Sequence, residues 1–224
     1  MNDLVKRLSK TTFFEKLPEK EICRLVDQAV LNKLYAGEFL CHQGDLWRNA
    51  VLLLKGELRW AMVSVGGREQ VLFRITPGRT FWAHTMFDDQ PMPASLSASK
   101  ASLVCLWSYD AIAPVLSRNP ILLWEILRQA TGTMRQAREV IYGLAFQPVA
   151  GRLARLLLEQ AARQEGQAVQ RELTLSEIAA TVATSQEVVC RLLYQFQADK
   201  LIELSRADFK LTDRTALEQV ADSH

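Results

Sequence analysis

One stretch of thirty residues constrains the fold of this chain more than any other. Residues 173–202 read LTLSEIAATVATSQEVVCRLLYQFQADKLI, which predicts two short helices joined by a tight turn. On the second predicted helix, 186–196, apolar and polar side chains fall on opposite arcs. The apolar arc holds Val188, Val189, Leu192, Leu193 and Phe196, and the polar arc holds Gln186, Glu187, Cys190, Arg191 and Tyr194. Because one arc can pack while the other faces a DNA groove, the stretch predicts a helix-turn-helix.

The first predicted helix, about 176–183, has the composition of a support for the second. Its apolar positions recur at helical spacing, and Ala179 and Ala180 are small enough for another helix to cross closely. Thr184 and Ser185 then interrupt the pattern, and the Ser185 hydroxyl suits the N-cap of the second helix. The start of that helix is therefore expected to be exposed.

Three polar side chains near this start match the chemistry of base edges. Arg191 can bond to both O6 and N7 of guanine, Glu187 can accept from the N4 amine of cytosine, and Gln186 can pair with adenine. We also assign Ser185 and Cys190 to the DNA-binding set because they lie on or beside the same arc. Thr174 and Ser176, near the start of the first helix, are candidates for phosphate contacts.

The segment after the second helix predicts a small wing. Residues 201–204 and 209–211 alternate in hydrophobicity around Ser205-Arg206-Ala207-Asp208, which indicates a two-stranded hairpin. Arg206 and Lys210 are candidates for phosphate contacts, although surface cations more often face only solvent.

Charge does not by itself favour DNA over a plain helical hairpin whose polar face meets water. Residues 147–224 contain nine Lys and Arg against eleven Asp and Glu, whereas a nucleic-acid domain usually has a basic surplus. Any phosphate-binding face must therefore be local. A helical pair that binds protein instead of DNA is a further alternative.

The first half of the chain has the pattern of an all-β domain. Residues 50–65 and 68–75 alternate around Gly66-Gly67, which predicts a hairpin with a tight turn. Further glycines and prolines separate short strands at the spacing of a β-roll. A roll of this kind can hold one small ligand.

After Asn119-Pro120 the pattern changes to one long helix that ends at Gln147-Pro148. Apolar residues follow one another in steps of four and three, which either a dimerisation seam or packing of one helix on its own roll would explain. We favour the dimer because a symmetric operator needs two recognition helices, one per subunit. The seam consists of Leu123, Leu127, Ala130, Met134, Ala137, Ile141 and Leu144. We assign Gln147-Pro148 as a hinge between sensor and DNA reader.

Length, targeting and cysteine usage narrow the protein class. The 224 residues, 49% of them hydrophobic, suffice for two cored domains, and no run predicts a signal peptide or a membrane span. The sequence thus predicts a cytoplasmic protein.

Its four cysteines are scattered without a C-x-x-C pair, so we expect buried small side chains and no metal site. No H-E-x-x-H, G-x-S-x-G or phosphate-loop pattern is present, and we expect no enzyme.

From Phe14 onward the chain resembles the Crp/Fnr family of bacterial transcription regulators. The residues that carry this resemblance are Phe14, Leu17, Gly37, Gln43-Gly44-Asp45, Gly56, Gly67, Gly78, Asn119-Pro120, Gly143-Leu144-Ala145-Phe146 and Gly151-Arg152. The resemblance implies an α+β fold with an effector-sensing, cyclic-nucleotide-binding-type β-roll (a jelly roll) in 1–118, a dimerisation helix in 119–146 and a winged helix-turn-helix in 147–224. It also implies a homodimer that binds double-stranded DNA at a palindromic operator and contacts RNA polymerase, with no membrane partner.

Within this resemblance Glu187 and Arg191 fall on the family's paired base readers, which recognise a TGA-like core. Gln186 differs from the Arg of the cyclic-AMP type, and Cys190 stands where the fumarate-nitrate type has Ser. The resemblance therefore implies half-sites closer to TTGA and TCAA than to the cyclic-AMP type.

The residues that would bind a cyclic nucleotide are missing. Relatives hold the ribose with Gly-Glu and clamp the cyclic phosphate with Arg-Ser, because a phosphodiester anion needs a fixed guanidinium. Ala83-His84 and Met92-Pro93 stand at these places, and Ala137 and Arg138 replace the base-contacting hydroxyls of the long helix. Arg74 or Arg79 could substitute for the clamp, but no spacing indicates it. We expect no cyclic AMP and, with Cys23 and Cys41 far apart, no iron–sulfur cluster.

The corresponding region is apolar and predicts a small organic effector of unknown identity. The expected lining, with the two long-helix positions, is Phe81, Trp82, His84, Met86, Phe87, Ala137 and Arg138. The alternative is a haem-based gas sensor, because carbon-monoxide-sensing relatives ligate haem iron with a histidine at the place of His84. Apart from that case we expect no metal. A protein without ligand, or regulated by a partner, is the remaining alternative.

Overall fold

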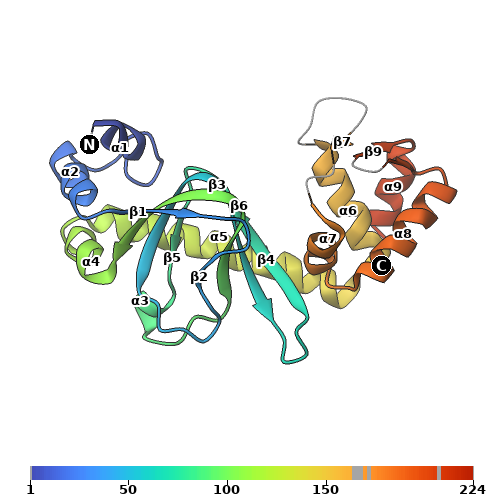
Figure 1. Cartoon of the computed structure of the whole chain (residues 1–224), viewed down its shortest axis with the longest axis horizontal. Helices are drawn as coiled ribbons and strands as arrows, with labels where there is room; N and C mark the ends of the chain where they lie inside the picture. Colours follow the sequence, from blue (N-terminus) through green and yellow to red (C-terminus); the bar gives the residue numbers. More distant parts are fainter. Residues whose placement is uncertain (1, 163–168, 171–172, 206–207, 224) are drawn as a thin grey trace. The chain divides into compact units, whose positions relative to one another are not determined.

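The computed structural model describes residues 2–162, 169–170, 173–205 and 208–223, and divides into two compact units. One unit comprises Met1–Gly67 and Val71–Gln136, and the other Arg68–Gln70 and Ala137–His224. Figure 1 labels the elements along the chain. No helix within the described ranges is long and apolar enough to cross a membrane.

The first unit is built on a rolled antiparallel sheet in the order β1-β6-β3-β4, with β2 also on β6 and β5 on β3. The strands are β1 (Val30–Leu34), β2 (Phe39–Cys41), β3 (Asn49–Val63), β4 (Glu69–Ile75), β5 (Thr80–Trp82) and β6 (Ser95–Ser108). The predicted β3–β4 hairpin is confirmed: Gly67 lies at a φ of 77° and its N–H donates to the Ser64 carbonyl. At Gly56 the φ is 93°, and a Cβ would stand 2.2 Å from the Ser102 hydroxyl, so only glycine fits this bulge.

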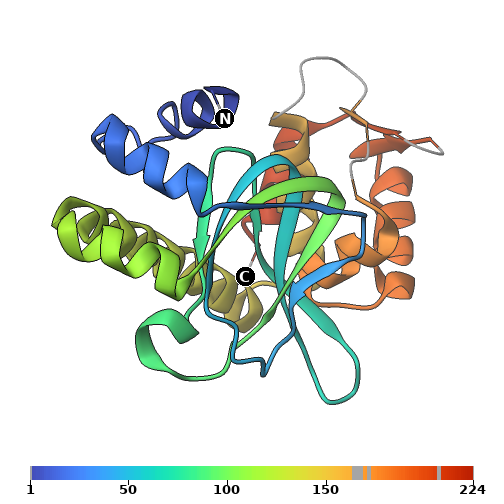
Figure 2. The same ribbon diagram turned by 60° about the vertical axis from the view of Figure 1, so that its left-hand side comes forward.

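Short helices lie together at one end of the roll, as Figures 1 and 2 show. They are α1 (Asn2–Leu8), α2 (Glu19–Asp27) and α4 (Tyr109–Arg118), while α3 (Thr85–Asp88) follows β5. The Trp107 indole donates to the Leu25 carbonyl at 2.7 Å, and its ring lies 5.5 Å from that of Phe14. This layer buries the outer face of β6, and the roll interior forms the rest of the core.

The long helix α5 (Pro120–Phe146) has the bounds that Asn119-Pro120 and Gln147-Pro148 predict. Leu122, Glu125 and Ile126 are buried on its roll-facing side, where Glu125 pairs with Lys16 at 3.4 Å. The compact units divide inside this helix, between Gln136 and Ala137. The predicted segment 119–146 therefore corresponds to one continuous helix, Pro120–Phe146, whose first part belongs to the first unit and whose last part belongs to the second.

The second unit is a winged helix-turn-helix, and the predicted fold class is confirmed. It contains α6 (Val149–Ala162), β7 (Val169–Gln170), α7 (Leu175–Val182), α8 (Gln186–Ala198), β8 (Ile202–Leu204), β9 (Asp208–Leu211) and α9 (Arg214–Ala221). The predicted two-stranded wing is present as β8 and β9, but β7 adds a third strand on β9 that the sequence did not indicate. Its own core gathers side chains from α6, α7, α8, the wing and α9.

Candidate nucleic-acid interface and effector site

Three local features fix the two ends of α7 and the start of α8. Thr174 caps α7 in a reciprocal capping box with Glu177. Ala183 ends α7 at a φ of 56°, and the Ser185 hydroxyl accepts the Val188 N–H at 3.4 Å to begin α8. The helix pair thus forms where the sequence predicts it.

The two faces of α8 are as the periodicity predicts. Val189, Leu193 and Phe196 are buried in the core of the unit, and Val188 and Leu192 are partly buried. On the other side Gln186, Glu187 and Arg191 are exposed, and Cys190 is partly exposed. The candidate base readers are therefore free to meet DNA.

The candidate phosphate contacts differ in how available they are. The Thr174 hydroxyl donates to the Glu177 carboxylate at 2.8 Å, and the backbone N–H of Thr174 donates to the same carboxylate at 2.9 Å. A phosphate at this helix start would meet that carboxylate, which argues against Thr174 as a contact. Ser176 and Ser185 are exposed, and Lys210 lies 3.9 Å from Glu203. Arg206 lies outside the described residues.

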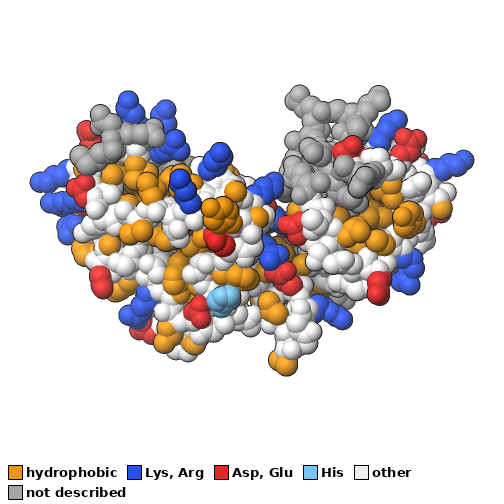
Figure 3. Space-filling view, viewed as in Figure 1, with side chains coloured by type: hydrophobic (Ala, Val, Ile, Leu, Met, Phe, Trp, Pro, Cys, Tyr) orange, Lys and Arg blue, Asp and Glu red, His pale blue; other side chains and the backbone are white. Residues whose placement is uncertain are grey.

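Several basic side chains of this unit lie beside acidic ones. Arg155 lies 3.3 Å from Asp222 and Arg214 lies 2.8 Å from Glu218. On the face drawn in Figure 3, blue and red side chains of this unit alternate without a broad blue area.

Arg152, named above only among the residues that carry the family resemblance, joins the end of α5 to the end of α7. Its guanidinium donates to the carbonyls of Gly143 at 3.2 Å, Gln147 at 2.6 Å and Val182 at 2.9 Å. Burial lowers the pKa of this guanidinium from its ordinary value. The predicted hinge at Gln147-Pro148 is therefore braced to the end of α7, and Gln147 itself is buried.

All seven predicted seam residues on α5 are exposed in the single chain. Met134 and Ile141 are 73% and 65% exposed, although both are large and apolar. The roll-facing side of the helix uses other residues, Leu122 and Ile126. The packing of α5 on its own roll thus does not account for the apolar seam.

The interior of the roll holds an aromatic cluster that includes two of the predicted effector residues. The rings of His84 and Trp60 stack in parallel with their centroids 5.0 Å apart. Phe73 and Phe81 lie 4.9 Å and 6.0 Å from the Trp60 ring. Trp60 was not predicted here, since its strand position alone does not show which ring it meets.

Other predicted effector residues do not join this cluster. Trp82 follows Phe81 on β5 and therefore points the opposite way, where its ring lies 4.9 Å from that of Phe13. Met86 is buried, but Phe87 is 53% exposed and does not line the interior. Ala137 and Arg138 are exposed residues of α5 that belong to the second unit.

Three buried polar atoms around the stack have no hydrogen-bond partner among the described residues. They are Nε1 of Trp60, Nδ1 of His84 and Oγ1 of Thr85. Burial lowers the pKa of His84, against an opposing effect of the Asp88 carboxylate, so the imidazole is neutral near pH 7. A neutral imidazole suits an iron ligand, but a porphyrin needs open space beside it, and the Trp60 ring covers one face of His84. The residues do not fit haem in this arrangement.

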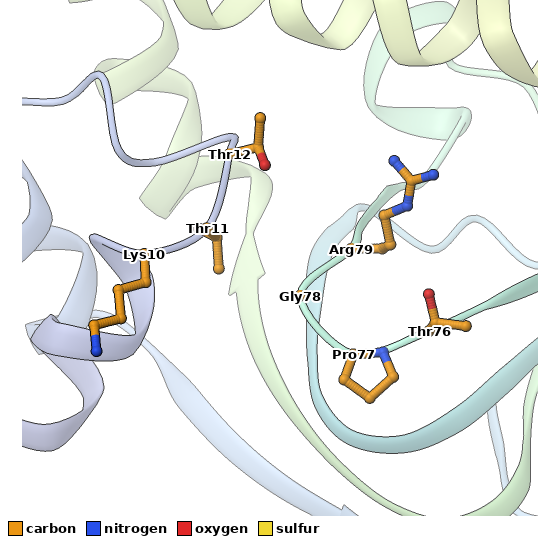
Figure 4. A pocket seen from close by; sticks show the side chains of 7 residues that line it. All are labelled: Lys10, Thr11, Thr12, Thr76, Pro77, Gly78 and Arg79. Atoms are coloured by element: carbon orange, nitrogen blue, oxygen red, sulfur yellow. The ribbon is translucent and has the colours of Figure 1, made fainter.

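Among the described residues, neither Arg74 nor Arg79 lies in the roll interior as a substitute for the missing phosphate clamp. Arg74 pairs with Glu57 at 2.7 Å, and it alternates along β4 with Phe73, which contacts Trp60. Arg79 is exposed in the turn before β5, beside an open depression of about 340 Å³. Figure 4 shows Lys10, Thr11 and Thr12 on one side of this depression and residues 76–79 on the other. Ala83 and Met92 are buried apolar side chains.

The cysteines are free thiols in different environments. Burial raises the pKa of Cys41 to about 11 and that of Cys105 to about 12. The expectation of burial is wrong for Cys23, which lies on the exposed side of α2, and Cys190 is partly exposed. Within the described ranges no group of three or more His, Cys, Asp or Glu side chains could hold a metal ion.

Comparison with known proteins identifies both units. The Crp-like helix-turn-helix domain matches residues 151–220, and the cyclic nucleotide-binding domain matches residues 31–119. The chain belongs to the Crp/Fnr family of transcription regulators. It is thus a Crp-like regulator with an effector-binding domain and a DNA-binding helix-turn-helix.

The relatives of this Crp/Fnr chain include regulators with different effectors. The CRP-like cAMP-activated global transcriptional regulator of Mycobacterium tuberculosis is 25% identical over 215 residues, covering 94% of this chain and 96% of the relative. A solved Crp/Fnr-family structure from Eubacterium rectale has a TM-score of 0.80 at 19% identity, covering 95% and 98%. The c-di-GMP responsive regulator CLP of Xanthomonas campestris has a TM-score of 0.78 at 20% identity, covering 88% and 100%. The fold thus occurs with more than one ligand.

Proposed function

We propose that this Crp/Fnr protein is a homodimeric regulator that binds a palindromic operator in the cytoplasm, contacts RNA polymerase and responds to a small effector other than a cyclic nucleotide. The observation that carries the proposal is α8, which presents Glu187 and Arg191 outward from a buried apolar face. These are the positions of the family's base readers.

The exposed seam of α5 supports the dimer. Two copies of this helix in a parallel pair would bury the seven seam side chains against each other. A two-fold dimer carries two copies of α8, which matches a palindrome with half-sites about one DNA turn apart.

The roll interior supports an effector that is not a cyclic nucleotide. By the resemblance, Ala83-His84 and Met92-Pro93 stand where relatives hold ribose and phosphate, and the Trp60 ring stacks on His84. The unpartnered atoms of Trp60, His84 and Thr85 suit a compact ligand with a few polar groups. A change in this packing would reach the DNA reader through α5 and its braced end at Arg152.

The DNA-binding assignment is tested by selecting an operator from random duplexes and comparing the parent with Arg191→Ala. We expect the substitution to cost about 1–3 kcal/mol of binding free energy and to relax one position of each half-site. Arg214→Ala, which removes an exposed cation paired with Glu218 on α9, is the matched control. Equal affinity and equal selectivity of Arg191→Ala and the parent would contradict the assignment.

The effector proposal is tested separately by spectroscopy and structure determination. Protein purified from cells should show residual density in the roll, and cyclic AMP should leave operator affinity unchanged. Reconstitution with haem tests the alternative, because a Soret band that is lost in His84→Ala would establish a haem sensor. A cyclic-AMP-dependent gain in operator affinity would overturn the proposed effector class.

A further inference from the structure

Tyr194 is a large aromatic residue on α8 whose side chain is not packed in the core of the unit. Its side chain is 69% exposed, whereas Leu193 and Phe196 beside it are buried in the core. Its hydroxyl makes no hydrogen bond to the described residues. The Tyr194 hydroxyl is therefore available to a partner molecule that approaches this face of α8.

The position of Tyr194 continues the line of the base readers. At about 100° per residue, Tyr194 lies within roughly 20° of Glu187 around the helix, and Arg191 lies to one side of the same line. Seven residues at 1.5 Å each place Tyr194 about 10 Å further along the axis than Glu187.

That displacement determines which part of DNA Tyr194 meets. In a helix-turn-helix the first residues of the recognition helix contact base edges in the major groove. A residue about 10 Å further along that helix lies beyond these first base contacts, and we take the sugar-phosphate backbone that borders the groove as the part of DNA that it meets. Tyrosine hydroxyls are among the usual donors to phosphate oxygens.

The scarcity of free cations makes such a neutral donor more important. Arg155, Lys210 and Arg214 lie within ion-pair distance of carboxylates, and Thr174 is engaged by Glu177. Arg191 contacts no carboxylate of the described chain, but it is assigned to a base. Lys200, just after the end of α8, is exposed and forms no ion pair with a described carboxylate, so free cations among the described residues of this unit are few and the hydroxyl of Tyr194 would add a neutral donor to them.

We propose that Tyr194 donates its hydroxyl to a backbone phosphate at the edge of each half-site. The contact positions α8 in the groove and carries no sequence information. It rests on DNA binding by the helix-turn-helix and not on the effector.

The test compares the full-length parent with Tyr194→Phe, which removes only the hydroxyl. Dissociation constants are measured at one salt concentration on the selected operator and on a random duplex of equal length. We expect a loss of roughly 5- to 50-fold, since a dimer loses one bond per subunit, and the same factor on both duplexes. Tyr35→Phe is the matched control, because Tyr35 is 76% exposed in the other unit.

A second measurement locates the contact on DNA. A methylphosphonate at the contacted phosphate of each half-site should weaken the parent and abolish its difference from Tyr194→Phe. The proposal is overturned if Tyr194→Phe binds as tightly as the parent on unmodified DNA. It is equally overturned if the loss occurs only on the operator and disappears when one thymine is replaced by uracil, because Tyr194 would then read a base.

Discussion

At the scale of single residues, His84 is the group whose protonation most clearly depends on the fold. Burial lowers its pKa below the ordinary value of 6.5, so the folded protein binds this proton less tightly than the unfolded chain does. The resulting stability is fully present above about pH 6.5 and is lost as the pH falls from there through the lowered folded pKa. We expect the melting temperature to fall more steeply between pH 7 and pH 5 in the parent than in His84→Gln.

The control for this prediction is His42→Gln, since His42 is exposed and lies outside the roll interior. It should keep the pH dependence of the parent. If His84→Gln and the parent lost stability in parallel, the buried neutral imidazole would be refuted.

The sequence predicts whether a side chain is buried or exposed where the periodicity of a helix or strand determines it. The exposure of Glu187 and Arg191 follows from the helical spacing of α8. The grouping of Trp82 with Phe81 did not hold because neighbours on a strand point to opposite faces. The stack of Trp60 on His84 joins residues that are far apart in the chain, and a local sequence pattern cannot predict such a contact.

At the scale of elements, the seam of α5 predicts the oligomeric state. Met134→Glu would place a carboxylate from each subunit in an apolar interface, which costs several kcal/mol per dimer. We expect at least about a 100-fold weaker dimer in sedimentation equilibrium and a parallel loss of operator affinity.

Gln136→Glu is the matched control, because it adds the same charge at an exposed position of α5 outside the seam. It should remain a dimer. A Met134→Glu protein that stays dimeric at concentrations where the parent is dimeric would show that another surface makes the dimer.

The junction at Arg152 joins the ends of α5 and α7 and gives a second prediction at this scale. Its guanidinium bonds three carbonyls, and a cation at these helix C-termini is further favoured by the helix dipoles. Arg152→Met should lower the free energy of unfolding by about 2–4 kcal/mol, and Arg152→Lys should recover part of it. Chemical denaturation of the full chain measures both.

Arg155→Met, one turn further on α6, is the control. Arg155 bonds the Ala221 carbonyl at 3.2 Å and the exposed Asp222 carboxylate at 3.3 Å, so its removal should cost less than about 1 kcal/mol. Equal losses in the Arg152 and Arg155 variants would mean that the three-carbonyl junction does not stabilise the unit.

Elements were predictable where the chain marks their ends. Pro120 and Pro148 bracket α5, and glycines mark the β3–β4 turn. The two-residue strand β7 was missed because its pairing with β9 depends on tertiary contact. The bonds of Arg152 were missed for the same reason, since they join the end of α5 to the Val182 carbonyl, 30 residues away in the chain.

At the scale of the whole molecule, charge is distributed unlike that of a typical DNA-binding protein. The formal net charge is only +2, and residues 147–224 have more acidic than basic side chains. Proteins that neutralise six or more phosphates with Lys and Arg lose affinity steeply with salt, because counterions are released in proportion to the phosphates neutralised.

This chain should instead bind its operator with a weak dependence on salt. We expect the slope of log K against log salt concentration to be shallower than about −5 for the dimer, because neutral donors and base contacts replace part of the usual cationic contribution. Titrations of the selected operator between 50 and 300 mM salt measure the slope as an order-of-magnitude test. Lys210→Gln should change it little, because Lys210 already lies 3.9 Å from Glu203. A slope of −8 or steeper would mean that cations outside the described residues dominate binding. Sequence-independent attraction to phosphates would then contribute more to affinity than the base contacts of α8.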